Sequence, residues 1–271
     1  MILIHFMIML NESFQKLYIQ VSLQNFSYCV KNQVSNQVSH IKSFTLDPYK
    51  TIEQQLDVFF DKEEALQSGF QDVVVLHHNN LNTFVPTALF DETSLGSYLQ
   101  YNTKVFPTDY FDYDNLPQSD MNNIYVPYVA FNNYFLDVFG SFTFQHINTS
   151  LVQHFLAKSG NDAVTNLFVH VGATHFELVL TKQKKLLFFN SYEFQTKEDF
   201  IYYLLFVFEQ LQLNPETQAV TFYGNISTES DLYQIAYRFI RHVSVADMQT
   251  LAQTLSVTYE ELKQHYILLH A

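Results

Sequence analysis

Apolar and polar residues alternate in two similar stretches of the chain, one near its start and one in its second half. In the first stretch, residues 17–23 and 26–30 alternate around a Gln-Asn turn, and in the second, residues 167–171 and 176–180 alternate around Gly-Ala-Thr-His. A period of two on both sides of a short turn is typical of a β-hairpin. The sequence therefore predicts one hairpin in each half.

Each hairpin is followed by the same order of further elements: a third strand, a helix and a buried strand. We expect them at residues 38–46, 48–60 and 72–79 in the first copy, and at residues 186–194, 197–211 and 219–225 in the second. Asp47 before Pro48 and Thr196 before Lys197 are helix-start signals, because these residue types cap or open a first turn. The pattern indicates a repeated unit.

A residue-by-residue alignment of the two copies gives a constant offset over the hairpin. The pairs separated by 150 positions are Leu17 with Leu167, Val21 with Val171, Phe26 with Phe176, and Phe44 with Phe194. Val74 and Val220 are 146 apart, which predicts a four-residue insertion or deletion between the copies. The shared order of elements supports the repeat more strongly than these few identities.

A three-stranded meander followed by alternating helices and strands is a mixed α/β unit. Two such units in tandem resemble the actin-like ATPase superfamily, which implies two ribonuclease-H-like domains with mixed sheets and a central nucleotide cleft. We expect an N-terminal extension at 1–15, a first domain at 16–149, a crossover helix and linker at 150–165, and a second domain at 166–271. The linker would contain Gly160, Asn161 and Asp162.

Four stretches carry a narrower resemblance. They read LYIQVSLQNFSYCV, TFVPTALF, LFFNSYEFQTKEDFIYYLLFVFEQL and VTFYGNIS. They are similar to a family of Bacteroidetes proteins named only as domain of unknown function 3822. That resemblance implies an actin-like fold and adds little chemistry.

The actin-like resemblance implies that two hairpin turns wrap phosphates and that an aspartate beside each organises Mg²⁺. In the first turn Gln20 stands at the aspartate position and Ser22 at the glycine position. In the second, His170 replaces the aspartate while Gly172 and Thr174 remain. A neutral amide and a histidine cannot replace two carboxylates, so we expect that ATP hydrolysis is lost.

The turn that would approach adenosine keeps Gly224, followed by Asn225. The simpler interpretation of Gly172 and Gly224 is that they serve strand-to-turn geometry. We therefore predict no catalytic residues and no cofactor, with Mg-ATP binding as the alternative.

The histidines suggest a second kind of chemistry. His78, His170 and His175 would converge if the two halves close as in the superfamily, with Glu177 as the nearest carboxylate in sequence. Ordinary hydrogen-bonded histidines are the simpler interpretation, and we predict no metal site. Nothing marks a catalytic nucleophile.

Composition restricts the partners. The formal net charge of −13 disfavours binding to nucleic acid and to anionic membranes. The one dense basic group, Lys182 with Lys184 and Lys185, is typical of a hairpin turn. The lone Cys29 permits no internal disulfide and suits a reducing compartment, so we expect a cytoplasmic protein.

Two apolar runs lack the features of a signal peptide or a membrane span. The first ten residues, MILIHFMIML, lack the charged region and cleavage site of a signal peptide, and we expect translation to begin at Met9. Residues 200–208 form an apolar run too short to span a bilayer, bounded by acidic residues. We predict no transmembrane segment.

Residues 106–123 combine aromatic residues with aspartates and prolines and read as a long loop. Tyr110, Phe111 and Tyr113 would form a partner-binding surface if exposed. Equally, these rings could fold back onto the body of the protein.

Three functional hypotheses follow. The first is a catalytically inactive actin-like protein that acts through contacts with a protein partner. The second is a divergent nucleotide-binding ATPase or kinase, and the third is an enzyme that uses histidines in the cleft. Fold alone does not decide between them.

Overall fold

The structure is a computed structural model that describes residues 14–67, 69–101, 103–106, 108–161 and 163–271. Nearly all of the predicted extension, including Met9, lies outside the described residues, as does Asp162 of the predicted linker.

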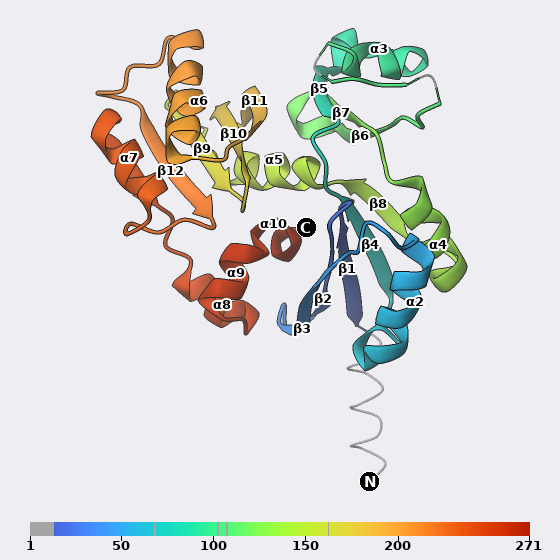
Figure 1. Cartoon of the computed structure of the whole chain (residues 1–271). Coiled ribbons are helices and arrows are strands. Elements are labelled where there is room, and N and C mark those ends of the chain that lie inside the picture. Colours follow the sequence, from blue (N-terminus) through green and yellow to red (C-terminus); the bar gives the residue numbers. More distant parts are fainter. Residues whose placement is uncertain (1–13, 68, 102, 107, 162) are drawn as a thin grey trace. The chain divides into compact units, whose positions relative to one another are not determined.

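The described residues form the following strands and helices (Figure 1). The strands are β1 (Gln15–Val21), β2 (Asn25–Asn32), β3 (Val38–Thr45), β4 (Asp72–His77), β5 (Asn82–Pro86), β6 (Asp112–Leu116), β7 (Met121–Tyr125), β8 (Thr143–His146), β9 (Thr165–Val171), β10 (His175–Lys182), β11 (Lys185–Glu193), β12 (Ala219–Gly224) and β13 (His242–Val245). The α-helices are α2 (Ile52–Lys62), α3 (Leu95–Leu99), α4 (Val129–Phe139), α5 (Ile147–Lys158), α6 (Lys197–Gln210), α7 (Asp231–Phe239), α8 (Gln249–Leu255), α9 (Tyr259–Gln264) and α10 (Tyr266–His270). Short 3-10 turns lie at Glu64–Leu66, Thr87–Leu89, Glu92–Ser94 and Pro117–Ser119.

Two five-stranded sheets have the same topology. The first has the strand order β3-β2-β1-β4-β8 and the second has the order β11-β10-β9-β12-β13. In each, the three meander strands pair antiparallel and the two later strands pair parallel. The predicted repeat and the mixed α/β architecture are both present.

The strand register corrects one alignment of the copies. Leu17 pairs with Val73 in the first sheet, and Leu167 pairs with Val220 in the second. Val73 is therefore the counterpart of Val220, and the predicted match with Val74 was wrong by one residue. Because side chains alternate across a strand, that slip would have placed the valine on the opposite face.

The third strand corrects a second alignment. Phe26 pairs with Phe44, whereas its counterpart Phe176 pairs with Tyr192. Phe44 therefore matches Tyr192, and the predicted match with Phe194 was wrong by two residues. The alternation of side chains within one strand does not predict how long the next turn is. The alignment of the following strand could therefore not be predicted.

One of the two predicted helix starts is confirmed. Thr196 caps α6 through a capping box with Asp199, and the helix begins at Lys197 as expected. The first-copy helix was predicted from Pro48, but α2 begins at Ile52 because the Thr51 hydroxyl accepts from the N–H of Gln54.

The segment 106–123 is not one long loop. Its second part contains β6 and the start of β7, which join β5 in a three-stranded sheet of order β5-β7-β6. We call this three-stranded sheet with α3 and its connecting segments, residues 82–125, the insert. β7 ends at Tyr125, and α4 follows.

The chain divides into two compact units, which we describe separately. Unit 1 holds the described residues up to Ser150 together with Gln253–Val257 and Ile267–Ala271, and unit 2 holds Leu151–Ala252 and Thr258–Tyr266. The predicted domain limits remain a prediction, although the helix expected from residue 150 begins earlier, at Ile147.

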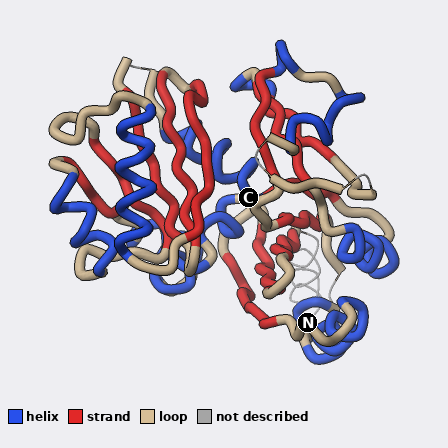
Figure 2. The backbone as a smooth tube through the Cα atoms, turned by 45° about the horizontal axis from the view of Figure 1, so that its top comes forward, coloured by secondary structure: helices blue, strands red, loops and turns tan. Residues whose placement is uncertain are grey.

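Each unit has its own apolar core between a sheet and two helices (Figures 1 and 2). In unit 1, α2 and α4 pack on the first sheet through Leu56, Phe131 and Phe135. In unit 2, α6 and α7 pack on the second sheet. Among the helices of the described residues, none is long and apolar enough to span a membrane.

Candidate functional site

The first predicted phosphate turn, between β1 and β2 in unit 1, is closed by its own side chain. The Ser22 hydroxyl accepts from the backbone N–H groups of Gln24 (3.3 Å) and Asn25 (2.9 Å). Gln20, at the expected aspartate position, lies 3.1 Å through its Nε2 from the Nδ1 of His78. Two of the N–H groups that could receive a phosphate are thus already bonded within the turn.

The second predicted turn, between β9 and β10 in unit 2, is built around a close contact. A Cβ atom on Gly172 would lie 2.7 Å from the ring of His175, so the glycine admits that ring. Its N–H donates to the His175 carbonyl at 2.8 Å, while Ala173 and Thr174 are exposed at the tip. Unlike the first turn, it has no hydroxyl at the glycine position that could accept from the N–H groups of its tip.

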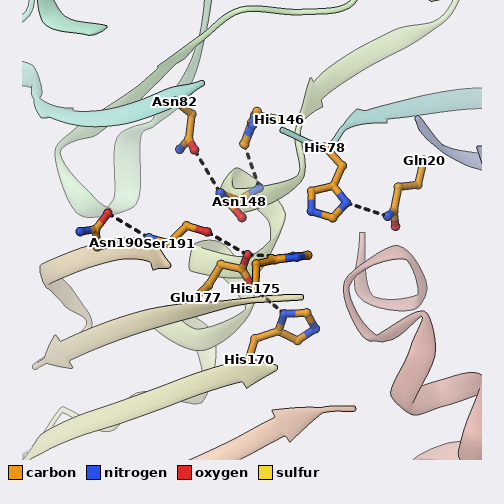
Figure 3. A network of polar contacts seen from close by, with 10 residues as sticks. All are labelled: Gln20, His78, Asn82, His146, Asn148, His170, His175, Glu177, Asn190 and Ser191. Carbon is orange, nitrogen blue, oxygen red and sulfur yellow. Dashed lines mark hydrogen bonds and ion pairs between the residues drawn. The ribbon is translucent and has the colours of Figure 1, made fainter. Parts of the chain in front are cut away.

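A buried carboxylate lies beneath this second turn. Glu177 is 2% exposed, and its two oxygens contact three side chains of unit 2 (Figure 3). One oxygen is 2.8 Å from His170 Nδ1, and the other is 3.3 Å from His175 Nε2 and accepts from the Ser191 hydroxyl at 3.3 Å. We call Glu177, His170, His175 and Ser191 the Glu177 cluster.

Strand register assembles most of this cluster. Glu177 on β10 lies directly opposite His170 on β9 and Ser191 on β11, and His170 in turn lies opposite Tyr223 on β12. Directly opposed residues on neighbouring strands share a face, so the four form one row across the sheet. Neighbours such as Val171, Phe176 and Phe222 point into the core on the other face.

Burial determines the chemistry of the Glu177 cluster. A carboxylate removed from water needs hydrogen-bond donors, and the two imidazoles and the hydroxyl supply them. A carboxylate bridging two imidazoles can orient them and hold their protons in place, which suits proton transfer or metal binding. In this structure the histidines occupy the oxygens that a magnesium-organising carboxylate would present to the ion.

The histidine at the aspartate position is also held by an aromatic ring. The ring of Tyr266 stacks on that of His170 with centroids 5.9 Å apart, and the Tyr266 hydroxyl is 2.7 Å from His154 Nε2. Burial raises the pKa of the Tyr266 phenol well above its usual range, so it stays neutral. His170 is therefore fixed from two sides within unit 2.

The third predicted turn reaches the same place. Gly224 has φ +82°, and a Cβ there would lie 2.5 Å from the Val171 carbonyl oxygen and 3.0 Å from the ring of His170. The N–H of Asn225 donates to that same carbonyl at 2.7 Å. The structure thus brings His170, Gly172 and Gly224 together in unit 2, while Gln20 and Ser22 belong to unit 1.

Replacing Gly224 with alanine is expected to lower the free energy of unfolding by about 2 kcal/mol, since the new Cβ adds strain at positive φ and meets a backbone oxygen. That corresponds to a melting temperature lower by about 4–8 °C. The matched control is Gly69→Ala, where a Cβ meets nothing within 4 Å. Equal melting temperatures for the two variants would contradict this account of Gly224.

Of the three histidines considered for a metal, two share a partner. His170 and His175 both contact Glu177 in unit 2, and His78 contacts Gln20 in unit 1. Sequence reasoning named Glu177 only as a nearby carboxylate and missed Ser191. The strand register was the signal that could have found both.

The candidate partner-binding residues in the insert have different environments. Phe111 and Tyr113 pack against a small core containing Val85, Leu99 and Ile124, which favours the interpretation that these two rings fold back. Tyr110 is 56% exposed. Further exposed aromatic side chains nearby in sequence are Tyr101 and Phe106.

Unit 1 holds a second carboxylate with several hydrogen-bond donors, half-buried, that the sequence did not indicate. Asp114 on β6 accepts hydrogen bonds from the Tyr125 hydroxyl (3.1 Å), the backbone N–H of His146 (2.8 Å) and the Thr149 hydroxyl. Burial raises the pKa of Asp114 to about 6 despite these donors. It links the insert to the start of α5.

The polar contacts continue along the start of α5. The side chain of His146 accepts from the backbone N–H of Asn148 at 3.1 Å, and the amide of Asn148 donates to Asn82 on β5 at 3.1 Å (Figure 3). The insert is therefore attached to the main sheet of unit 1 through buried hydrogen bonds as well as through the chain.

Comparison with known proteins gives a family and a fold. A family model described as "Protein of unknown function (DUF3822)" matches residues 7–243. A search of curated protein sequences found no significant match.

Two solved structures are similar over most of the chain. One is a Bacteroides thetaiotaomicron protein described as having an actin-like ATPase fold and unknown function, with a TM-score of 0.78 at 21% identity, covering 90% of this chain and 96% of its own. The other is from a PilM-PilN type IV pilus biogenesis complex, with a TM-score of 0.62 at 12% identity, covering 94% and 96%. The predicted actin-like ATPase fold is confirmed.

Proposed function

The chain belongs to the DUF3822 family, and from that premise we propose that it is a non-hydrolysing protein of actin-like fold that acts through contacts with a protein partner. One observation carries the proposal. The carboxylates expected beside the two phosphate turns are replaced by Gln20 and His170, and the nearest carboxylate, Glu177, is buried under histidines. Because neither aspartate is present, the Mg²⁺ that phosphoryl transfer requires lacks its two expected organising ligands.

The first turn adds to this argument. The Ser22 hydroxyl occupies the N–H groups of Gln24 and Asn25, so binding a phosphate there would first require breaking these hydrogen bonds. A structural relative has been solved in a PilM-PilN complex, which supports a role in protein assembly for this fold. We propose the exposed Tyr110 segment as one surface for such a partner.

A nucleotide-binding role is the second candidate, because the second turn keeps its glycine. Ala173 and Thr174 are exposed at its tip, and Gly172 and Gly224 remain beside it. This turn alone could offer backbone N–H groups to an anion without a metal. The two candidates differ in one measurable property, which is affinity for a nucleotide.

Thermal unfolding with Mg-ATP, Mg-ADP and Mg²⁺ alone separates them. We expect no difference between the nucleotide and Mg²⁺-only curves at millimolar concentration. A nucleotide at about one hundred times its dissociation constant would add about 2.7 kcal/mol, or roughly 5–10 °C for a chain of this size. A saturable rise of that size would reject the proposed function in favour of the second candidate.

A further inference from the structure

Helix α6 in unit 2 carries apolar side chains on more of its circumference than its own core uses. Phe200, Leu204 and Val207 are buried against the second sheet. Tyr202 and Phe206 instead remain 63% and 41% exposed. A helix that is apolar nearly all round is usually covered on both sides.

The two exposed rings form a single feature. Tyr202 and Phe206 are one turn apart, and their rings stack with centroids 6.4 Å apart and an interplanar angle of 19°. Large exposed aromatic side chains of this kind are the usual anchors of protein interfaces. The pair therefore presents an ordered apolar surface on α6.

A glutamate lies at each end of this aromatic pair. Glu198 precedes Tyr202 by four residues and Glu209 follows Phe206 by three, so all four side chains lie on one face of the helix, and both glutamates are exposed. The glutamates are eleven residues apart, or about 16 Å along the axis. We call Glu198, Tyr202, Phe206 and Glu209 the α6 stripe.

The two glutamates restrict what could bind the α6 stripe. An anionic membrane surface would be repelled by both glutamates. In a second copy of this chain paired about a two-fold axis at Leu204, Glu209 would lie beside the first turn of the other α6, where Glu198 and Asp199 are. Like charges would then meet at both ends, which disfavours self-association through this face.

We propose that the α6 stripe binds an amphipathic helix of a protein partner, apolar in its middle and with a Lys or Arg at each end about eleven residues apart. Helix-on-helix docking through apolar anchors with charged flanks is a common mode of recognition. This inference rests on the proposed function in that both require a protein partner. It assigns that partner a chemistry and a place on unit 2, apart from the Tyr110 segment of unit 1.

The test uses two labelled synthetic helices of eighteen residues, blocked at both ends, alanine-rich, with leucines along one face. One carries lysine and the other glutamate at the two flanking positions, eleven residues apart. Peptide binding is measured by fluorescence anisotropy at low salt. The lysine peptide is expected to bind about five-fold more tightly than the glutamate peptide, because it can form two exposed ion pairs. In the variant Glu198→Lys/Glu209→Lys the preference should reverse.

The variant Tyr202→Ser/Phe206→Ser should weaken lysine-peptide binding by about ten-fold or more, because it removes both anchors. Both rings point away from the core, and circular dichroism melts check that each variant folds. Tyr110→Ser is the matched control, with an exposed aromatic removed from unit 1, and should leave peptide binding unchanged.

Equal affinity of the two peptides for the wild-type chain would overturn the inference, as would no binding, or a preference that survives charge reversal. The nucleotide titration decides the proposed function without using α6. A nucleotide-induced rise in melting temperature beside normal peptide discrimination would reject that function alone. If instead the two peptides bind equally and nucleotide leaves the melting temperature unchanged, the role of the α6 stripe alone would be rejected.

Discussion

Replacing Glu177 with alanine is expected to lower the free energy of unfolding by about 3–5 kcal/mol, the range for breaking a buried ion pair. The carboxylate is 2% exposed and contacts His170, His175 and Ser191. Its removal leaves donors without these acceptors in a water-poor place and also opens a cavity. The melting temperature should fall by about 6–20 °C.

Calorimetry and circular dichroism suit this measurement, because the chain has no tryptophan. The control is Glu216→Ala, an exposed glutamate of unit 2, which should change stability by no more than about 0.5 kcal/mol. Glu177→Gln keeps the shape and should cost less than Glu177→Ala, since an amide oxygen still accepts a hydrogen bond. If Glu177→Ala unfolds like Glu216→Ala, the cluster does not stabilise unit 2.

The free energy of unfolding of unit 1 is expected to fall as pH rises and Asp114 loses its proton. The pKa of this carboxyl is about 6 in the folded chain, raised by burial from the ordinary 3.8. Between these two values the folded state binds more protons than the unfolded state, so the free energy of unfolding decreases with rising pH. The full loss, about 3 kcal/mol, is reached above pH 6 and is absent below pH 3.8.

Some other carboxyls have the opposite effect, so Asp114 is isolated by a difference. The pKa values of Glu63 and Glu261 are lowered, by Lys42 in one case and by the N–H of Thr258 in the other, and their contributions are lost as pH falls. We therefore compare wild type with Asp114→Asn by urea unfolding at intervals from pH 4 to pH 7.5. The wild type should lose about 3 kcal/mol relative to the variant across this range.

The exposed aspartate Asp61 provides the matched control in unit 1. Asp61→Asn should follow the wild-type profile, because its carboxyl already lies in water. Parallel wild-type and Asp114→Asn profiles would mean that the Asp114 carboxyl does not titrate between pH 4 and 7.5. The attachment of the insert to α5 would then be insensitive to pH.

The sequence by itself determined the order of the elements in the two repeated units. Alternation with period two marked the hairpins, and Thr196 marked the start of α6. These signals are local, because a cap or a turn depends on residues within four positions of each other. The same locality let the repeat and its resemblance to the actin-like fold be predicted before any contact was known.

The tertiary structure alone decided which side chains meet. The matching of Val73 with Val220 depends on how strands far apart in sequence align, and the row of His170, Glu177 and Ser191 depends on the register of three consecutive strands. A shift of one residue exchanges the two faces of a strand, and no pattern within a single strand encodes that shift. Likewise, the contact of Asp114 with Thr149 on α5, and the packing of Phe111 and Tyr113 on the small core of the insert, depend on how separate segments pack together.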